Sequence, residues 1–187
     1  MAITGLVGVR AAEVGENGFQ NAFHVGDAMQ ANLTVTMAEG SLYANNRRKE
    51  HKQKFDSGSL ELGVDDLIDT VQVKMLGHRT KSVTVDSSTV TVNVSNEKDS
   101  SPVLGVGFYQ TVTRNNVDMV RVIILLRTQF AEPADNAQTA DNNITMNGRT
   151  TTGTIMSDEN GDWKYDVTVA TVEEAEALLD AVLGPVS

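Results

Sequence analysis

The sequence predicts a mainly β protein, a β-sandwich or barrel-like fold with one flanking α-helix and a C-terminal α-helix. The apolar positions are mainly Val, Ile, Leu and Met, whereas aromatic residues make up only 5% of the chain. Apolar and polar residues alternate in several short segments, as in half-buried strands, and helical spacing recurs in two stretches. We expect residues 1–187 to form a single domain, because domains span roughly 50–250 residues.

Two segments near the N-terminus alternate strictly. In residues 32–37, Leu33, Val35 and Met37 fall on one face, and residues 59–64 repeat the pattern. Both are predicted to be half-buried strands of an antiparallel sheet, since such a sheet buries one face and leaves the other in water.

The segment between these strands is polar and mostly basic, and a long loop is expected at about 45–58. Hairpin connections usually take roughly two to five residues, so the length indicates a function. Three interpretations remain open: a solvated loop, an arm that meets acidic surface on a neighbouring subunit, and a nucleic-acid contact. The last is disfavoured by the lack of interleaved aromatic residues. The candidate interface residues are Arg47, Arg48, Lys49, Lys52, Lys54 and Phe55.

A helix is predicted after the second strand. Asp65 and Asp66 suit its N-terminal end, which favours acidic side chains, and Gly77 is placed to end it. The apolar residues at helical spacing are Val64, Ile68, Val71 and Met75. Residues 83–85 and 90–94 then alternate in opposite phase, which predicts two strands joined by a turn at residues 86–88.

Residues 104–113 and 117–127 are predicted to form a hairpin around Asn115 and Asn116. The second strand contains a continuous apolar run, which needs cover on both faces. With only two helices predicted, we expect a partner subunit to supply part of that cover. The run, a candidate inner-barrel or ring-packing strand, consists of Val122, Ile123, Ile124, Leu125 and Leu126.

The C-terminal quarter predicts one more hairpin and the second helix. Residues 152–157 are expected to pair with residues 163–169 across a turn at 159–162, with Trp163, Tyr165, Val167 and Val169 facing inward. Thr171 and Glu174 have the spacing of a capping box, which predicts that a helix begins there and ends near Gly184.

The formal charge of −10 argues against DNA binding, because binding to phosphates depends on Lys and Arg. No cysteine is present, which excludes disulfides and thiolate metal sites. The first 14 residues lack a basic segment followed by an apolar core, so no signal peptide is expected. No segment approaches the roughly 20 apolar residues of a membrane span, and a cytoplasm-like compartment is expected.

No catalytic, metal or cofactor site is expected. His24, His51 and His78 lie far apart in sequence and have no metal-ligand neighbours at helical or strand spacing. Residues 158–162 faintly resemble a calcium loop, but the twelfth position is Val169 and not a glutamate. Residues 105–108 open a strand rather than a helix, which argues against a dinucleotide fingerprint, and no Gly-x-Ser-x-Gly elbow occurs.

Four stretches in order along the chain resemble the major tail protein family of long, flexible-tailed bacteriophages. The first is residues 42–47 (LYANNR) followed by Phe55, and the second is residues 60–67 (LELGVDDL) continuing to residues 75–78 (MLGH). The third is residues 106–108 (VGF) with residues 129–133 (QFAEP). The fourth is residues 153–155 (GTI) with residues 158–164 (DENGDWK). The chain departs from the family pattern at residues 83–94, which are longer and richer in Thr and Val than is usual there.

The resemblance implies a tail tube fold whose subunits form hexameric rings. Inner strands would join into one barrel, and long loops and termini would stack the rings into a tube. The implied location is the virion tail, assembled in the host cytoplasm, with no membrane. The implied partners are further copies of the chain, a tape-measure protein, and tail terminator and tip proteins. Genomic DNA would pass through the lumen during ejection without specific binding, because carboxylates that face the lumen prevent adhesion.

Two alternatives to a siphophage tube remain open. One is the tube protein of a type VI secretion system or a tailocin, which would share the ring architecture. The other is a monomeric β-sandwich binding module, such as a virion decoration domain. Rings or polymers in solution would exclude the second alternative, and a neighbouring gene for a tape-measure protein would separate the tubes.

Overall fold

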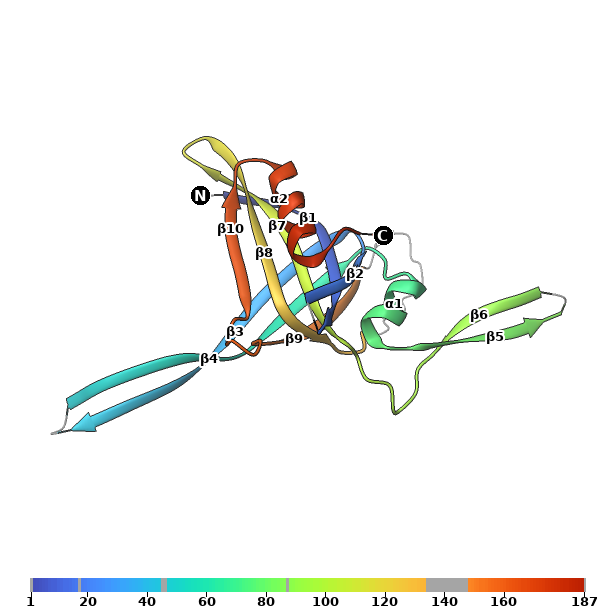
Figure 1. The fold of residues 1–187 in the computed structure, drawn as a ribbon, viewed down its shortest axis with the longest axis horizontal. Coiled ribbons are helices and arrows are strands. Elements are labelled where there is room, and N and C mark those ends of the chain that lie inside the picture. Colours follow the sequence, from blue (N-terminus) through green and yellow to red (C-terminus); the bar gives the residue numbers. More distant parts are fainter. Residues whose placement is uncertain (1, 17, 45–46, 87, 134–147, 187) are drawn as a thin grey trace, which may run out of the picture.

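The computed structural model describes residues 2–16, 18–44, 47–86, 88–133 and 148–186. They form ten strands and two helices (Figure 1). The helices are α1 (Asp69–Leu76) and α2 (Val172–Leu183). The strands are β1 (Ala2–Gly15), β2 (Gly18–His24), β3 (Ala28–Ala44), β4 (Arg47–Val64), β5 (Arg79–Val85), β6 (Ser88–Val94), β7 (Val103–Arg114), β8 (Val117–Phe130), β9 (Arg149–Met156) and β10 (Lys164–Val169).

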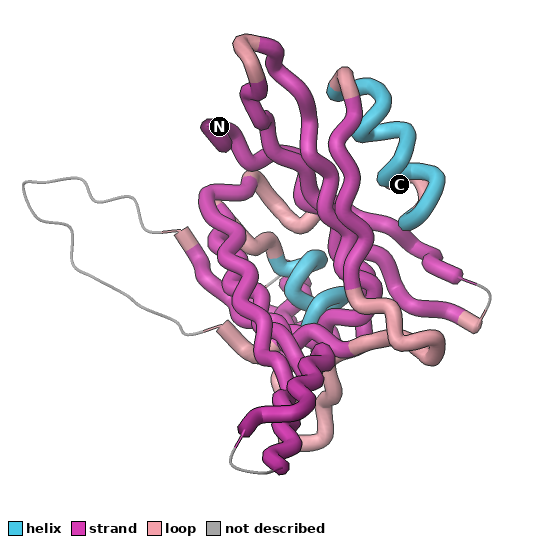
Figure 2. The backbone as a smooth tube through the Cα atoms, turned by 90° about the vertical axis from the view of Figure 1, so that its left-hand side faces the viewer, coloured by secondary structure: helices cyan, strands magenta, loops and turns pink. Residues whose placement is uncertain are grey.

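One large antiparallel sheet forms the body. Its strands follow the order β2-β1-β7-β8-β9-β4-β3, and β10 pairs separately with β8. This path is open, so the sheet does not close into a barrel. The sheet bends until its two halves face each other across one core, while α2 lies along its outer face (Figure 2). The predicted mainly β, sandwich-like class with two helices is therefore confirmed.

The core between the two halves is made by alternate residues of the strands, because strand side chains alternate between faces. Val9 of β1, Leu62 of β4, Val106 of β7 and Ile155 of β9 are completely buried there. Each such side chain contributes roughly 1.5–3 kcal/mol when it leaves water. Helix α1 closes one end of this core with Met75, which is also fully buried.

The apolar run of β8 is buried on both faces within the subunit. Residues 122–126 are at most 6% exposed, and Ile123 and Leu125 point into the core between the sheet halves. The other three pack on the opposite face against Leu179 and Leu183 of α2. The expectation that a partner subunit covers this run is wrong, since the chain's own C-terminal helix does so.

The two hairpin turns predicted from their residues are both present. Asn115 and Asn116 connect β7 to β8 with positive φ values of 51° and 60°, as a type I′ turn demands. Strands β5 and β6 pair with each other from Arg79 opposite Val94 to Val85 opposite Ser88. Both hairpins are confirmed.

The predicted hairpin between residues 152–157 and 163–169 is wrong. Strands β9 and β10 both pair with β8, β9 with residues 127–130 and β10 with residues 120–125, so they follow one another along one edge of β8. The turn at residues 158–162 connects β9 to β10, but these two strands do not pair with each other. Tyr165 and Val167 are 45% and 42% exposed, and do not face inward as expected.

Both helices match their predicted positions in part. Strand β4 continues to Val64, and α1 begins at Asp69, four residues after Asp65. Gly77 ends the helix with a φ of 73°. In α2, the Thr171 hydroxyl accepts a hydrogen bond from the Glu174 backbone N–H at 3.2 Å, as the capping box predicts. The buried stripe is Ala175, Leu179 and Leu183.

The long loop expected at about 45–58 is largely β-structure. Residues 47–58 belong to β4 and pair with β3, so the described part of this segment forms the outer half of a two-stranded ribbon. Hydrophobic alternation is absent at residues 50–54 because both faces of the ribbon meet water there.

Candidate functional site

The β3–β4 ribbon extends far beyond the body (Figure 1). Its ladder runs from Ala28 opposite Val64 to Ala44 opposite Arg47. Residues 34–41 and 50–54 are exposed on both faces. An isolated two-stranded ribbon without a buried face is only marginally stable in water. Contact with another surface would therefore stabilise this ribbon.

The base of the ribbon is fixed to the body by an aromatic stack. The rings of Phe55 and Trp163 lie parallel within 5°, with centroids 4.6 Å apart. Close by, buried Gly58 lets the ribbon approach β9, since a Cβ at this position would lie 3.2 Å from the Ile155 side chain. The structure thus places Phe55, an interface candidate from the sequence, in a contact that supports its own subunit.

The two faces of the outer ribbon differ in whether their polar side chains form hydrogen bonds within the ribbon. On one face, the Ser41 hydroxyl lies 3.0 Å from Nδ1 of His51, and Gln53 donates a hydrogen bond to Glu39. On the other face, Lys52 lies opposite Gly40 and Lys54 opposite Ala38. Neither small residue offers a partner, and no described residue forms an ion pair with either lysine.

The remaining basic candidates lie at the outer end of the ribbon. Strand β4 begins with Arg47 and Arg48, whose backbone is opposite Ala44 and Tyr43, and Lys49 follows. Residues 36–55 contain five Lys or Arg and two Glu, a net charge of +3, in a chain with a net charge of −10. The structure thus gathers all five basic candidates on one projecting element.

A second hairpin, β5–β6, projects from the other side of the body in Figure 1. Every described residue of β5 is exposed, and Val83, Val85 and Val90 are 39–55% exposed. Val83 lies directly opposite Val90, so these side chains share one face. This hairpin occupies the stretch that departs from the tail protein pattern.

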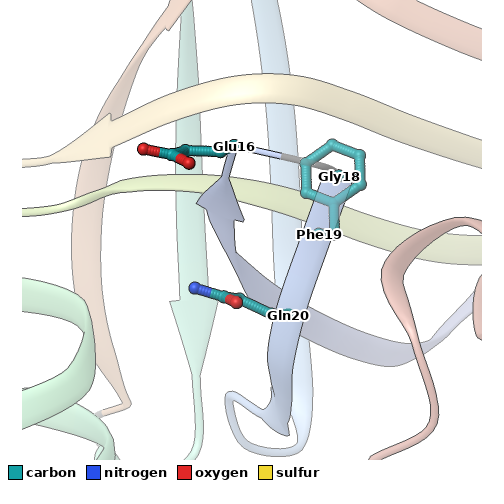
Figure 3. Close-up of a pocket in the computed structure, with 4 residues that line it drawn as sticks. All are labelled: Glu16, Gly18, Phe19 and Gln20. Atoms are coloured by element: carbon teal, nitrogen blue, oxygen red, sulfur yellow. The ribbon is translucent and has the colours of Figure 1, made fainter.

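One hollow of the described surface lacks a set of groups arranged for catalysis. The hollow shown in Figure 3 has a volume of about 390 Å³ and is lined by Glu16, Gly18, Phe19 and Gln20. It offers one carboxylate and one amide, with no described nucleophile or base beside them. No group of three or more His, Asp or Glu in the described residues could hold a metal ion.

The carboxylate of Asp158 is used to form the turn that resembled a calcium loop. Its Oδ1 accepts hydrogen bonds from the backbone N–H groups of Asn160 at 2.9 Å and Asp162 at 2.8 Å. The stretch therefore has a local structural role as an Asx-type turn.

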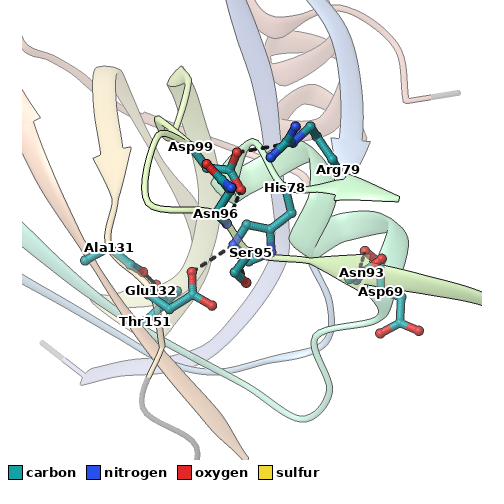
Figure 4. A network of polar contacts seen from close by, with 10 residues as sticks. All are labelled: Asp69, His78, Arg79, Asn93, Ser95, Asn96, Asp99, Ala131, Glu132 and Thr151. Carbon is teal, nitrogen blue, oxygen red and sulfur yellow. Dashed lines mark hydrogen bonds and ion pairs between the residues drawn. The ribbon is translucent and has the colours of Figure 1, made fainter. Parts of the chain in front are cut away.

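A polar network joins the base of β5 to the chain that leaves β8 (Figure 4). Nε2 of buried His78 lies 2.9 Å from a carboxylate oxygen of Glu132 and 3.4 Å from the Ser95 hydroxyl. Arg79 approaches Asp99 at 3.6 Å. His24 and His51 are exposed and take no part in this network.

No match to this chain was found among models of known protein families or among curated proteins. No helix within the described ranges has the length and apolar character needed to cross a membrane. The case for a function therefore rests on the surfaces that the fold exposes.

Sequence reasoning identified the basic residues of the ribbon but missed their arrangement. Residues 47–54 are polar at every position, so they lack the apolar–polar alternation that would have indicated a ribbon rather than a loop. The role of Phe55 could not be read from the sequence, because its partner Trp163 lies more than one hundred residues away.

Proposed function

We propose that this chain is a structural protein that assembles with copies of itself, as the major tail tube subunit of a long, flexible-tailed bacteriophage. In this proposal, hexameric rings stack into a tube that conducts DNA during ejection. The observation that carries it is the β3–β4 ribbon, which is exposed on both faces at residues 34–41 and 50–54 and is cationic on an acidic subunit. The four-part sequence resemblance gives the kind of assembly.

The subunit buries its own core side chains, and those side chains are therefore not available for contacts with other subunits. The apolar run of β8 is already covered by α2, so its side chains supply no contact surface. In this proposal, assembly uses the projecting hairpins and the open sheet edges of β2, β3 and β10. Unpaired strand edges pair readily with other chains, and a closed ring of subunits would leave none exposed.

The acidic composition supports the role of a conduit. Duplex DNA carries one negative charge per roughly 1.7 Å of its axis, so a basic lumen would bind it. Carboxylates that face the lumen would repel DNA over a Debye length of about 8 Å at physiological salt. The net charge of −10 fits a tube that DNA passes without adhesion.

Replacing the ribbon's basic residues tests this proposal. The variant carries Arg47→Ser, Arg48→Ser, Lys52→Ser and Lys54→Ser. We expect the circular dichroism spectrum of the parent but fewer rings or tubes by sedimentation velocity. One exposed ion pair contributes only about 0–1 kcal/mol, but the contact repeats along the assembly. High salt should weaken the parent assembly in the same direction.

Two outcomes would count against the ribbon as an assembly element. If the variant polymerises as well as the parent, the ribbon is a solvated arm and its charge serves no contact. If it loses its fold, these residues support the subunit, and the contact lies elsewhere.

A further inference from the structure

The β3–β4 ribbon carries opposite charges at its two ends. Asp27 directly precedes β3, and Asp65 and Asp66 directly follow β4, so three carboxylates lie at the end next to α1. The basic residues lie at the other end. Strand β3 has 17 residues, which at roughly 3.3 Å per residue separates the two ends by about 50 Å. One element thus presents cations at one end and anions at the other.

An apolar groove lies between the carboxylates. We call it the α1 groove; it has a volume of about 480 Å³ and is lined by His24, Val25, Gly26, Asp27, Asp65, Asp66, Ile68 and Val71. Val25 and Val71 are buried and form an apolar floor, whereas Ile68 is 55% exposed at the rim. Groove and carboxylates together fit an elongated cationic segment.

The geometry of the α1 groove is fixed by backbone contacts. The Asp65 N–H donates to the Asp27 carbonyl at 3.0 Å, and the Asp27 N–H donates to the Asp65 carboxylate at 3.0 Å. Gly26 fits tightly, because a Cβ there would lie 2.8 Å from the Asp66 carbonyl oxygen. Among the described residues, Asp27 and Asp66 have no ion-pair partner.

The lysine face of the outer ribbon borders a hollow of its own. Gly40 and Ala38 lie opposite Lys52 and Lys54, and a hollow of about 290 Å³ is lined by Ala38, Glu39, Gly40, Lys52, Gln53 and Lys54.

We propose that the α1 groove of one subunit receives the lysine face of the β3–β4 ribbon of a second copy. This inference rests on the proposed function, since it names the surface that the ribbon contacts in the tube. The contact is heterologous: donor and acceptor surfaces differ and lie at opposite ends of the ribbon. A heterologous contact that does not close propagates without limit, which is the symmetry of a stacked tube.

Charge favours a second copy as the occupant. Subunits with a net charge of −10 repel one another, so a stable contact must bring the positive ribbon against a negative surface. Lys52 and Lys54 supply two charges, and Asp27 and Asp66 supply two of opposite sign without ion-pair partners in the described chain. In addition, the apolar floor of the groove would bury apolar surface of the ribbon, which an ion pair at the surface does not do.

Paired charge reversals test this contact. One variant carries Lys52→Glu and Lys54→Glu, and the other carries Asp27→Lys and Asp66→Lys. Asp65 stays intact because its carboxylate holds the Asp27 N–H. Each variant alone should raise the protein concentration needed for polymerisation at least ~10-fold, as charge reversal at a complementary interface does. An equimolar mixture should polymerise again, because each reversed ribbon meets a reversed groove.

The control variant Glu97→Lys with Glu159→Lys makes the same change in net charge as the groove variant, at exposed positions away from the groove. It should polymerise like the parent. If the groove variant also polymerises like the parent while the ribbon variant does not, the ribbon contacts another surface and this inference is wrong, although the proposed function stands. If the parent itself forms no polymer, the proposed function fails first. The inference would also be wrong if neither variant polymerises alone and their equimolar mixture does not polymerise either.

Discussion

Asp166 links two strands through its charge. Its carboxylate accepts a hydrogen bond from Nε of Arg121 at 2.8 Å, a second from the same guanidinium, and one from Lys164 at 3.1 Å. Hydrogen bonding to Arg121, opposed by burial, lowers the pKa of Asp166 from 3.8 to about 2. Because Arg121 belongs to β8 and Asp166 to β10, this cluster holds β10 against the sheet.

The Asp166→Asn substitution should therefore produce a pH-dependent loss of stability. The folded pKa is below the unfolded value, so the stabilisation is complete above about pH 4 and is lost as the pH falls through about 2. We expect a deficit below about 1 kcal/mol at neutral pH, since the cluster is partly exposed. Urea unfolding at a series of pH values should show this deficit shrinking in acid. A deficit that is constant across the series, or equal to that of Glu159→Gln, would contradict this account.

Helix α2 lets the subunit bury the apolar run of β8 without a partner. Leu179 and Leu183 pack over β8, and Gly107 of β7 admits them, because a Cβ there would lie 2.5 Å from the Leu179 side chain. The Tyr109 hydroxyl donates to Glu176 at 3.2 Å, and burial together with that carboxylate raises the pKa of Tyr109. An ion pair between Arg10 and Asp180 fixes the other end of the helix.

Leu179→Ala should cost about 2–4 kcal/mol of unfolding free energy, as expected for a leucine that loses its buried contacts. Val172→Ala, at a position 42% exposed on the same helix, should cost less than about 1 kcal/mol. Chemical denaturation of the two variants measures the difference. Equal costs would mean that α2 does not hold the apolar run, and a partner subunit would again be needed to cover it.

Alternation predicted strands both where one face is buried and in the exposed β5–β6 hairpin, but it failed where both faces of a strand carry polar residues. Residues 59–64 alternate because one side of β4 meets the core there. Farther out the same strand lacks alternation, so the sequence predicts a loop at about 45–58 where the structure has β4 from Arg47. The apolar run at residues 122–126 indicates that both faces of the strand are buried. It does not indicate that α2 buries one of them, because packing between segments distant in sequence leaves no local pattern.

Pairing between neighbouring segments was also predicted correctly only when a tight turn enforced it. Asn115 and Asn116 joined their two strands as expected, since a two-residue turn permits only a hairpin. The longer connection at residues 158–162 allowed β10 to pair with β8 instead of β9. For the candidate site, the sequence supplied the basic residues, and the fold supplied the lysine face and the carboxylate groove at opposite ends of one ribbon.

At the scale of the whole molecule, two hairpins project from opposite sides of a body that has already buried its core (Figure 1). A monomer would gain nothing from exposing so much regular β-structure, because unpaired edges invite uncontrolled association. Subunits that dock ribbon to groove in one direction would turn those edges and charges into a defined polymer.

Negative-stain electron microscopy of the purified protein tests the central claim most directly. Samples should be concentrated and incubated for long periods at low salt, because nucleation of a polymer can be slow. The account predicts rings with a central hole, or tubes built from such rings, and their loss at high salt. Single particles of subunit size under every condition, with a monomer mass in sedimentation equilibrium, would contradict it.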